Sequence, residues 1–97
     1  MVKQEEVLRL IGERTLEGRS TSYRTLAREL ELSEPAACEH LKRAWRERLI
    51  RSSDRPPRYK FRLEAGESIR DLRFQLSVRG KERLRWYAER DEEEGWL

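Results

Sequence analysis

The spacing of the apolar residues changes twice along this chain of 97 residues, and this restricts its fold most. Up to about residue 49 the apolar residues recur at helical spacing, in residues 58–63 and 72–76 they alternate with polar residues, and from 78 the helical spacing returns. Alternation places successive side chains on opposite faces of a strand, whereas helical spacing makes one apolar stripe. The sequence therefore predicts an α+β fold of three helices, a β-hairpin and a last helix.

The first two helices are predicted from their apolar stripes and their ends. The first covers residues 3–17 and is expected to stop at Gly18, a typical C-cap residue. Its stripe consists of Val7, Leu8, Leu10, Ile11 and Leu16. Residues 20–22 offer N-caps for a second, short helix that ends near Glu31. Ala27 of that helix has a small side chain and would let the third helix approach closely.

The third helix is predicted to begin at Ser33 or Glu34, with Pro35 in its first turn, where the missing N–H costs nothing. It is expected to run to about Leu49. Its inner stripe would consist of Ala37, Leu41, Ala44 or Trp45, and Leu49.

A three-stranded meander is predicted after the third helix. Its strands would cover residues 49–52, 58–63 and 72–76, with apolar residues on one face of the last two. Ser77 would cap a last helix from Val78 to about Glu93. Residues 1–76 are thus expected to form one domain, and residues 77–97 a C-terminal helix, a possible dimerisation element, with an acidic tail.

The composition narrows the class of protein. Charged residues make up 42% of the chain and apolar residues 36%, which suits one modest core. One cysteine and one histidine exclude an internal disulfide and a zinc site, and no signal peptide or membrane span is evident. We expect a cytoplasmic protein without cofactor, metal or evident small-molecule effector. No phosphate loop, carboxylate pair or activated nucleophile predicts an enzyme.

The basic residues are unevenly distributed. Residues 42–62 hold nine basic and only two acidic residues, although the whole chain has a net charge of +3. Such a block either contacts phosphates or is a solvated face, and its place on the third helix and the hairpin favours phosphates. The basic candidates for DNA contacts are Lys42, Arg43, Arg46, Arg51, Arg55, Arg58, Lys60 and Arg62, together with Arg24 and Arg28 on the second helix.

Three segments resemble one family of DNA-binding domains. They are residues 26–33 (LARELELS), 36–42 (AACEHLK) and 49–51 (LIR). This spacing resembles winged helix-turn-helix repressors, most of all the DNA-binding domain of LexA-type repressors, followed by the ArsR and MarR families. The resemblance covers about residues 4 to 63. It implies a three-helix core with a β-hairpin wing that binds double-stranded DNA.

The resemblance also nominates residues that would touch the operator: Ser33, Pro35, Ala36, Cys38 and Glu39. Two of them depart from the family pattern, because Pro35 stands where a polar base-reading residue is usual and Cys38 replaces an acid. Arg48 stands where a helix-ending glycine is common, and Ala44 replaces a leucine, so we expect Trp45 to supply the missing core volume.

Two functions remain open. The first is a transcriptional regulator, a repressor, that binds DNA as a homodimer paired through the last helix. The alternative is a winged-helix module that binds a protein in a transcription or replication complex, since Pro35, Ala36, Cys38 and Glu39 are apolar or acidic where DNA readers are usually polar or basic. Cys38 and His40 are two residues apart on a helix, so they do not face each other as metal ligands would. Cys38 is expected to be exposed or half-buried and His40 partly buried.

Overall fold

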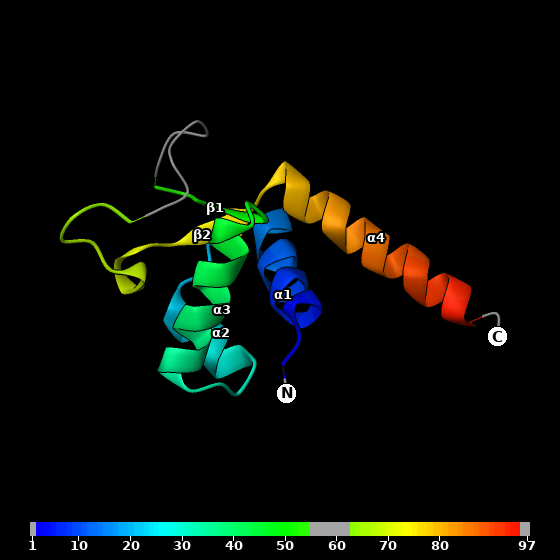
Figure 1. The fold of residues 1–97 in the computed structure, drawn as a ribbon, viewed down its shortest axis with the longest axis horizontal. Coiled ribbons are helices and arrows are strands. Elements are labelled where there is room, and N and C mark those ends of the chain that lie inside the picture. Colours follow the sequence, from blue (N-terminus) through cyan, green and yellow to red (C-terminus); the bar gives the residue numbers. More distant parts are fainter. Residues whose placement is uncertain (1, 55–62, 96–97) are drawn as a thin grey trace.

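The computed structural model describes residues 2–54 and 63–95 (Figure 1). In these ranges the fold is α+β, with four α-helices, one 3-10 helix and a two-stranded antiparallel sheet, an arrangement compatible with a winged helix. The elements are α1 (Gln4–Leu16), α2 (Tyr23–Glu29), α3 (Glu34–Arg46), β1 (Ile50–Ser52), η1 (Ile69–Asp71), β2 (Phe74–Leu76) and α4 (Val78–Gly95). The first three helices gather on one side of the sheet, whereas α4 extends away from the body.

Three helices begin at the serines that the sequence nominates. The side chain of Ser22 accepts a hydrogen bond from the Thr25 amide, and that of Ser33 accepts one from the Ala36 amide. Ser77 accepts one from the amide of Gly80 at 3.0 Å. These bonds satisfy backbone donors that lack a partner in the first turn of a helix, so the predicted N-caps are confirmed.

The first three helices end in the same way. Gly18, Glu31 and Arg48 adopt the left-handed conformation, with φ of 74°, 53° and 63°. In each case the next amide donates to the carbonyl five residues before it, at 2.8–2.9 Å, which defines a Schellman motif. The expectation that the third helix runs to about Leu49 is therefore wrong. It ends at Arg46, because Arg48 takes up the conformation that a C-cap glycine usually supplies.

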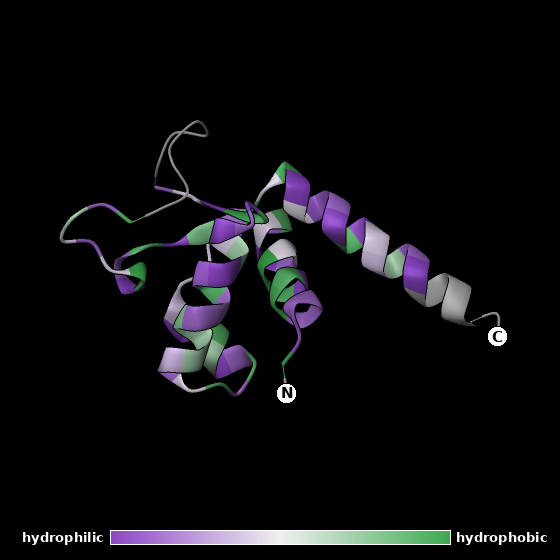
Figure 2. Ribbon diagram, viewed as in Figure 1, coloured by the Kyte–Doolittle hydropathy of each residue, from purple (hydrophilic) through white to green (hydrophobic). Residues whose placement is uncertain are grey.

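The core lies between the helices and the sheet. The apolar stripe predicted for α3 is confirmed, since Ala37, Leu41, Ala44, Trp45 and Leu49 are all buried. Figure 2 shows that hydrophilic residues predominate along the coloured part of α4, whereas α1 and α3 contain both hydrophilic and hydrophobic residues. The expected place of Leu16 in the stripe of α1 is wrong, because Leu16 is 87% exposed. It follows Val7 by nine residues, which is about two and a half turns and puts it on the opposite side of the helix.

The sheet differs from the predicted meander. β2 pairs directly with β1, with Ile50 opposite Leu76 and Ser52 opposite Phe74, and the other edge of Phe74 bridges to Thr21. In a meander the strand at 58–63 would lie between β1 and β2. Here β1 lies directly on one side of Phe74 and Thr21 on the other, so there is no room for a strand between β1 and β2. The strand expected at 58–63 lies outside the described residues except for Leu63, which is half-buried and not in a strand. The alternation predicted for 72–76 is confirmed by the burial of its apolar residues.

Glycine allows α4 to approach the rest of the fold. A Cβ atom on Gly80 would lie 2.0 Å from the carbonyl oxygen of Leu49. On Gly12 of α1 it would lie 3.1 Å from a methyl group of Leu84. The start of α4 is therefore fixed against α1 and the backbone after α3. None of the described helices combines the length and the apolar character that crossing a bilayer requires.

Replacement of Glu31 by glycine is expected to stabilise the protein. The left-handed conformation is strained for a side chain with a Cβ atom but not for glycine. We expect Glu31→Gly to raise the free energy of unfolding by about 1 kcal/mol, or the Tm by about 4–8 °C, measured by thermal denaturation. Glu31→Ala keeps the Cβ atom and should give no such gain. An equal gain from both variants would contradict the strain at this position.

Replacement of Gly80 by alanine is expected to destabilise the protein despite a more favourable helix propensity. The added methyl group would meet a backbone oxygen that cannot move alone, so we expect a net loss of roughly 2 kcal/mol in urea denaturation, after a propensity gain of about 1 kcal/mol. Gly12→Ala meets only the flexible ends of leucine side chains and should cost less. If Gly80→Ala were as stable as the original chain, α4 would not approach this closely.

Candidate nucleic-acid interface

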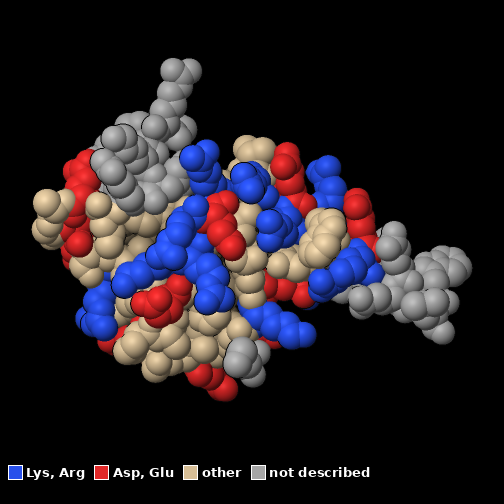
Figure 3. All heavy atoms as spheres, viewed as in Figure 1, with Lys and Arg blue, Asp and Glu red and all other residues tan. Residues whose placement is uncertain are grey.

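The outward face of α3 is the centre of the candidate interface. α3 packs on α2, on β1 and on η1, which cover its apolar stripe and one flank. Pro35, Glu39, Arg43 and Arg46 are exposed on the side away from this stripe. In Figure 3 Lys and Arg side chains spread over the part of this view where Figure 1 draws α3, interrupted by carboxylates. The face is thus mixed in charge, and the first half of α3 differs from its last turns.

Arg43 and Arg46 provide the free positive charge of this face. They lie three residues apart in the last turns of α3, so both point to the same side of the helix. Neither forms an ion pair or hydrogen bond with any part of the chain that the structure describes. Cations are also favoured here by the helix dipole, which is negative at this end. Both guanidinium groups are therefore free to bind an anion.

The first half of α3 presents small and neutralised groups. The Ser33 hydroxyl is used as the N-cap, 3.2 Å from the amide of Ala36. Pro35 is exposed and Ala36 is half-buried. Glu39 lies 3.5 Å from the ammonium group of Lys42, so each largely cancels the charge of the other. This half of the helix contributes shape rather than charge.

Cys38 is not part of the exposed face, contrary to the sequence-based expectation. Its side chain is buried, with only 6% of its surface exposed. It lies on the flank of α3 against which η1 packs, and both line a groove of about 410 Å³ between α3 and residues 63–70. Cys38 is thus covered by a segment that lies far away in the sequence. His40 is half-buried, as expected.

Two arginines flank Tyr23, the first residue of α2. The guanidinium carbon of Arg70 lies 5.1 Å from the centre of the Tyr23 ring, and Arg70 also pairs with Glu34 at 3.5 Å. Arg24 donates a hydrogen bond to the Tyr23 hydroxyl at 3.1 Å. This bond, with the charges of Tyr23 and Glu34, raises the pKa of Arg24 above its ordinary value. Arg24 is exposed and positively charged, whereas Arg70 holds η1 against the helices.

The sequence analysis missed Arg70. The available signal was the segment Ser68 to Asp71, which matches the capping-box pattern and indicates an ordered turn. The structure contains this capping box, in which the Asp71 carboxylate accepts from the Ser68 amide at 3.2 Å.

Among the remaining basic candidates, Arg28 and Arg51 already have partners within the chain. Arg28 lies 3.6 Å from Glu29, and Arg51 of β1 donates to the side chain of Gln75 at 3.0 Å. Arg73, which the sequence analysis did not nominate, pairs with Asp54 at 3.5 Å. The wing candidates Arg55, Arg58, Lys60 and Arg62 lie outside the described residues.

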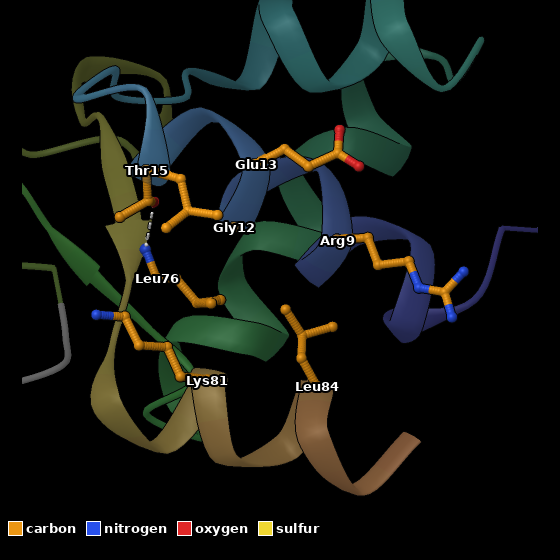
Figure 4. Close-up of a pocket in the computed structure, with 8 residues that line it drawn as sticks. Arg9, Gly12, Glu13, Thr15, Leu76, Lys81 and Leu84 are labelled. Carbon is orange, nitrogen blue, oxygen red and sulfur yellow. Dashed lines mark hydrogen bonds between the residues drawn. The ribbon is translucent and has the colours of Figure 1, made fainter. Parts of the chain in front are cut away.

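A second hollow, of about 470 Å³, lies between α1, β2 and α4 (Figure 4). Leu76 and Leu84 point into it, and the Thr15 hydroxyl accepts a hydrogen bond from the Leu76 amide at 2.9 Å. Arg9 and Lys81 also line it. None of the residues nominated for contacts with DNA lines this hollow, so it is separate from the candidate interface.

Comparison with protein-family models, curated proteins and solved structures finds no match to this chain.

Loss of Arg70 is expected to loosen η1. Arg70→Ala removes the ring contact with Tyr23 and the ion pair with Glu34, and we expect the hydrogen-exchange protection of the amide of Leu72 to fall by about 1 kcal/mol. Arg73→Ala, which removes one exposed ion pair, should change this protection by less than about 0.5 kcal/mol. Equal effects of the two substitutions would show that Arg70 does not hold the segment.

Proposed function

We propose that the protein is a transcriptional regulator, a repressor, that binds specific double-stranded DNA sequences as a winged helix-turn-helix domain. The observation that carries this proposal is the pair Arg43 and Arg46, exposed on one face of α3 and without a partner in the described parts of the chain. DNA is the partner that such groups suit, since it carries one negative charge per about 1.7 Å of its axis.

The shape of the helix pair supports the same proposal. α3 has 13 residues and is therefore about 20 Å long, and an α-helix fits into the major groove. α2 packs on α3, as a bracing helix would, and its small Ala27 is buried. The first turn of a recognition helix contacts bases, and here Pro35 and Ala36 would contact thymine methyl groups while Ser33 would approach the backbone.

The other basic residues take supporting roles in this proposal. Arg24, exposed at the start of α2, would contact a phosphate, with Arg28 beside it. Arg51, Arg55, Arg58, Lys60 and Arg62 would contact the backbone from the wing. The protein would act as a homodimer on two half-sites about 10 bp apart or a multiple of this distance.

A protein partner is the second candidate. The first half of α3 favours it, because Pro35 is exposed beside Glu39, whose charge is already paired with Lys42. A winged helix can serve either use, so the two candidates differ only in what α3 contacts. Under this alternative Arg43 and Arg46 would not affect binding to DNA.

Substitution of both arginines tests the proposal. We expect Arg43→Gln with Arg46→Gln to weaken binding to all duplex sequences alike. It should also lower the magnitude of the slope of log K against log salt by about 0.9 for each lost phosphate contact. The measurement is fluorescence anisotropy with a duplex selected from a random pool, at several salt concentrations. Arg85→Gln, which removes an exposed arginine from α4, is the matched control and should leave the slope unchanged.

Two results would contradict this function. The first is an affinity for duplex DNA that does not depend on salt. The second is a double variant that binds DNA as tightly as the original chain, which would leave the protein partner as the better explanation.

A further inference from the structure

The charges of α4 run against the helix dipole. Residues 79–85 contain four basic residues and one acidic residue, whereas residues 86–94 contain five acidic residues and one basic residue. The first turn has no acidic residue and the last turn no basic one. A helix dipole favours the reverse order, so this charge pattern destabilises α4 as an isolated helix. Opposite charges outside the helix would offset this effect.

The charges of α4 are also antisymmetric about Trp86. Four residues before Trp86 stands Glu82 and four after it Arg90, and seven before it stands Arg79 and seven after it Glu93. The pairs at three and five residues are likewise opposite in charge: Arg83 with Glu89, and Lys81 with Asp91. Two copies of the helix, laid antiparallel with Trp86 opposite Trp86, would therefore oppose unlike charges at positions 79, 82, 90 and 93, which lie on the same side of the helix as Trp86.

The structure leaves the required face open. α4 packs on α1 through Leu84 and Tyr87, and the Tyr87 hydroxyl donates a hydrogen bond to the side chain of Gln4 at 3.2 Å. Arg79, Glu82 and Arg90 are exposed, and within residues 78–90, the part of α4 whose side chains the structure describes, no two charged side chains form an ion pair. Positions 79, 82, 86, 90 and 93 follow the three-to-four-residue spacing of one helix face.

Trp86 lies at the centre of this face. Its side chain is 52% exposed, which is unusual for so large an apolar group. Its ring is nevertheless ordered, because the Tyr87 ring packs edge-on against it at 5.1 Å and the guanidinium carbon of Arg90 lies 5.0 Å from its centre. An exposed aromatic side chain that is already held in place loses little conformational entropy when it is covered.

We propose that a second copy of this chain covers this face, with the two α4 helices antiparallel and crossing at Trp86. The interface is isologous, so each oppositely charged pair occurs twice, as Arg79 with Glu93 of the other copy and Glu82 with Arg90 of the other copy. The inference rests on the homodimer of the proposed function and specifies its contacts. It does not depend on what α3 binds.

A charge exchange tests the pairing in the full-length chain. The first variant combines Arg79→Glu with Arg90→Glu, and the second combines Glu82→Arg with Glu93→Arg. Each variant alone opposes like charges at all four contacts, whereas a mixture of the two restores four unlike pairs. By sedimentation velocity we expect the original chain to be a dimer. We expect each variant alone to dimerise at least about tenfold more weakly, and the equimolar mixture to recover the original affinity.

The outcomes separate this pairing from other arrangements. A monomeric original chain at millimolar concentration, variants that dimerise as well as the original, or a mixture that does not recover would each overturn it. Circular dichroism verifies that both variants are folded. If either is unfolded, two single variants, Arg79→Glu and Glu93→Arg, are compared alone and as a mixture in the same way.

DNA binding is measured in a separate experiment, on a duplex that contains a single half-site. A dimer that fails to bind this duplex would overturn the proposed function and leave the pairing intact. A chain that binds it in a salt-dependent way but fails the exchange experiment would overturn only the pairing.

Discussion

The position of α3 depends on Phe74. This residue is fully buried at the start of β2, where its backbone exchanges two hydrogen bonds with Thr21, at 2.8 and 2.9 Å, while Ser52 of β1 pairs with it from the other side. Its ring packs edge-on against Trp45 of α3, with 5.6 Å between the ring centres. One residue therefore joins the segment before α2, the strand after α3 and the inner face of α3 itself. The outward direction of Arg43 and Arg46 follows from this contact.

The features that the sequence predicted correctly are local. An N-cap such as Ser22 or Ser33 bonds a backbone amide three residues away, so it can be recognised from its neighbours alone. The left-handed ends at Glu31 and Arg48 are also local, but neither residue is glycine. The family resemblance offered a sign only for Arg48, which stands where a helix-ending glycine is common. The order of the strands was mispredicted because it depends on pairing between segments more than 20 residues apart, which alternation does not specify.

The same distinction applies to the candidate interface. The basic character of α3 could be predicted, because Arg43 and Arg46 lie on the side opposite Leu41. Which charges stay free could not, since it also depends on partners far away in the sequence, such as Gln75, which accepts a hydrogen bond from Arg51. The burial of Cys38 was missed for a related reason. It results from η1, which reaches α3 from about 30 residues further along the chain.

The charges at the ends of α3 and of α4 are arranged in opposite ways relative to the helix dipole. In α3 the acid Glu34 lies in the first turn and Arg43 and Arg46 in the last, so these charges stabilise the helix and remain free for an external anion. In α4 the order is reversed, which costs up to about 1 kcal/mol for each terminal charge until opposite charges come close. A polyanion cannot supply both signs, whereas a second, antiparallel α4 can. The two proposals therefore assign DNA to α3 and a second copy of the chain to α4.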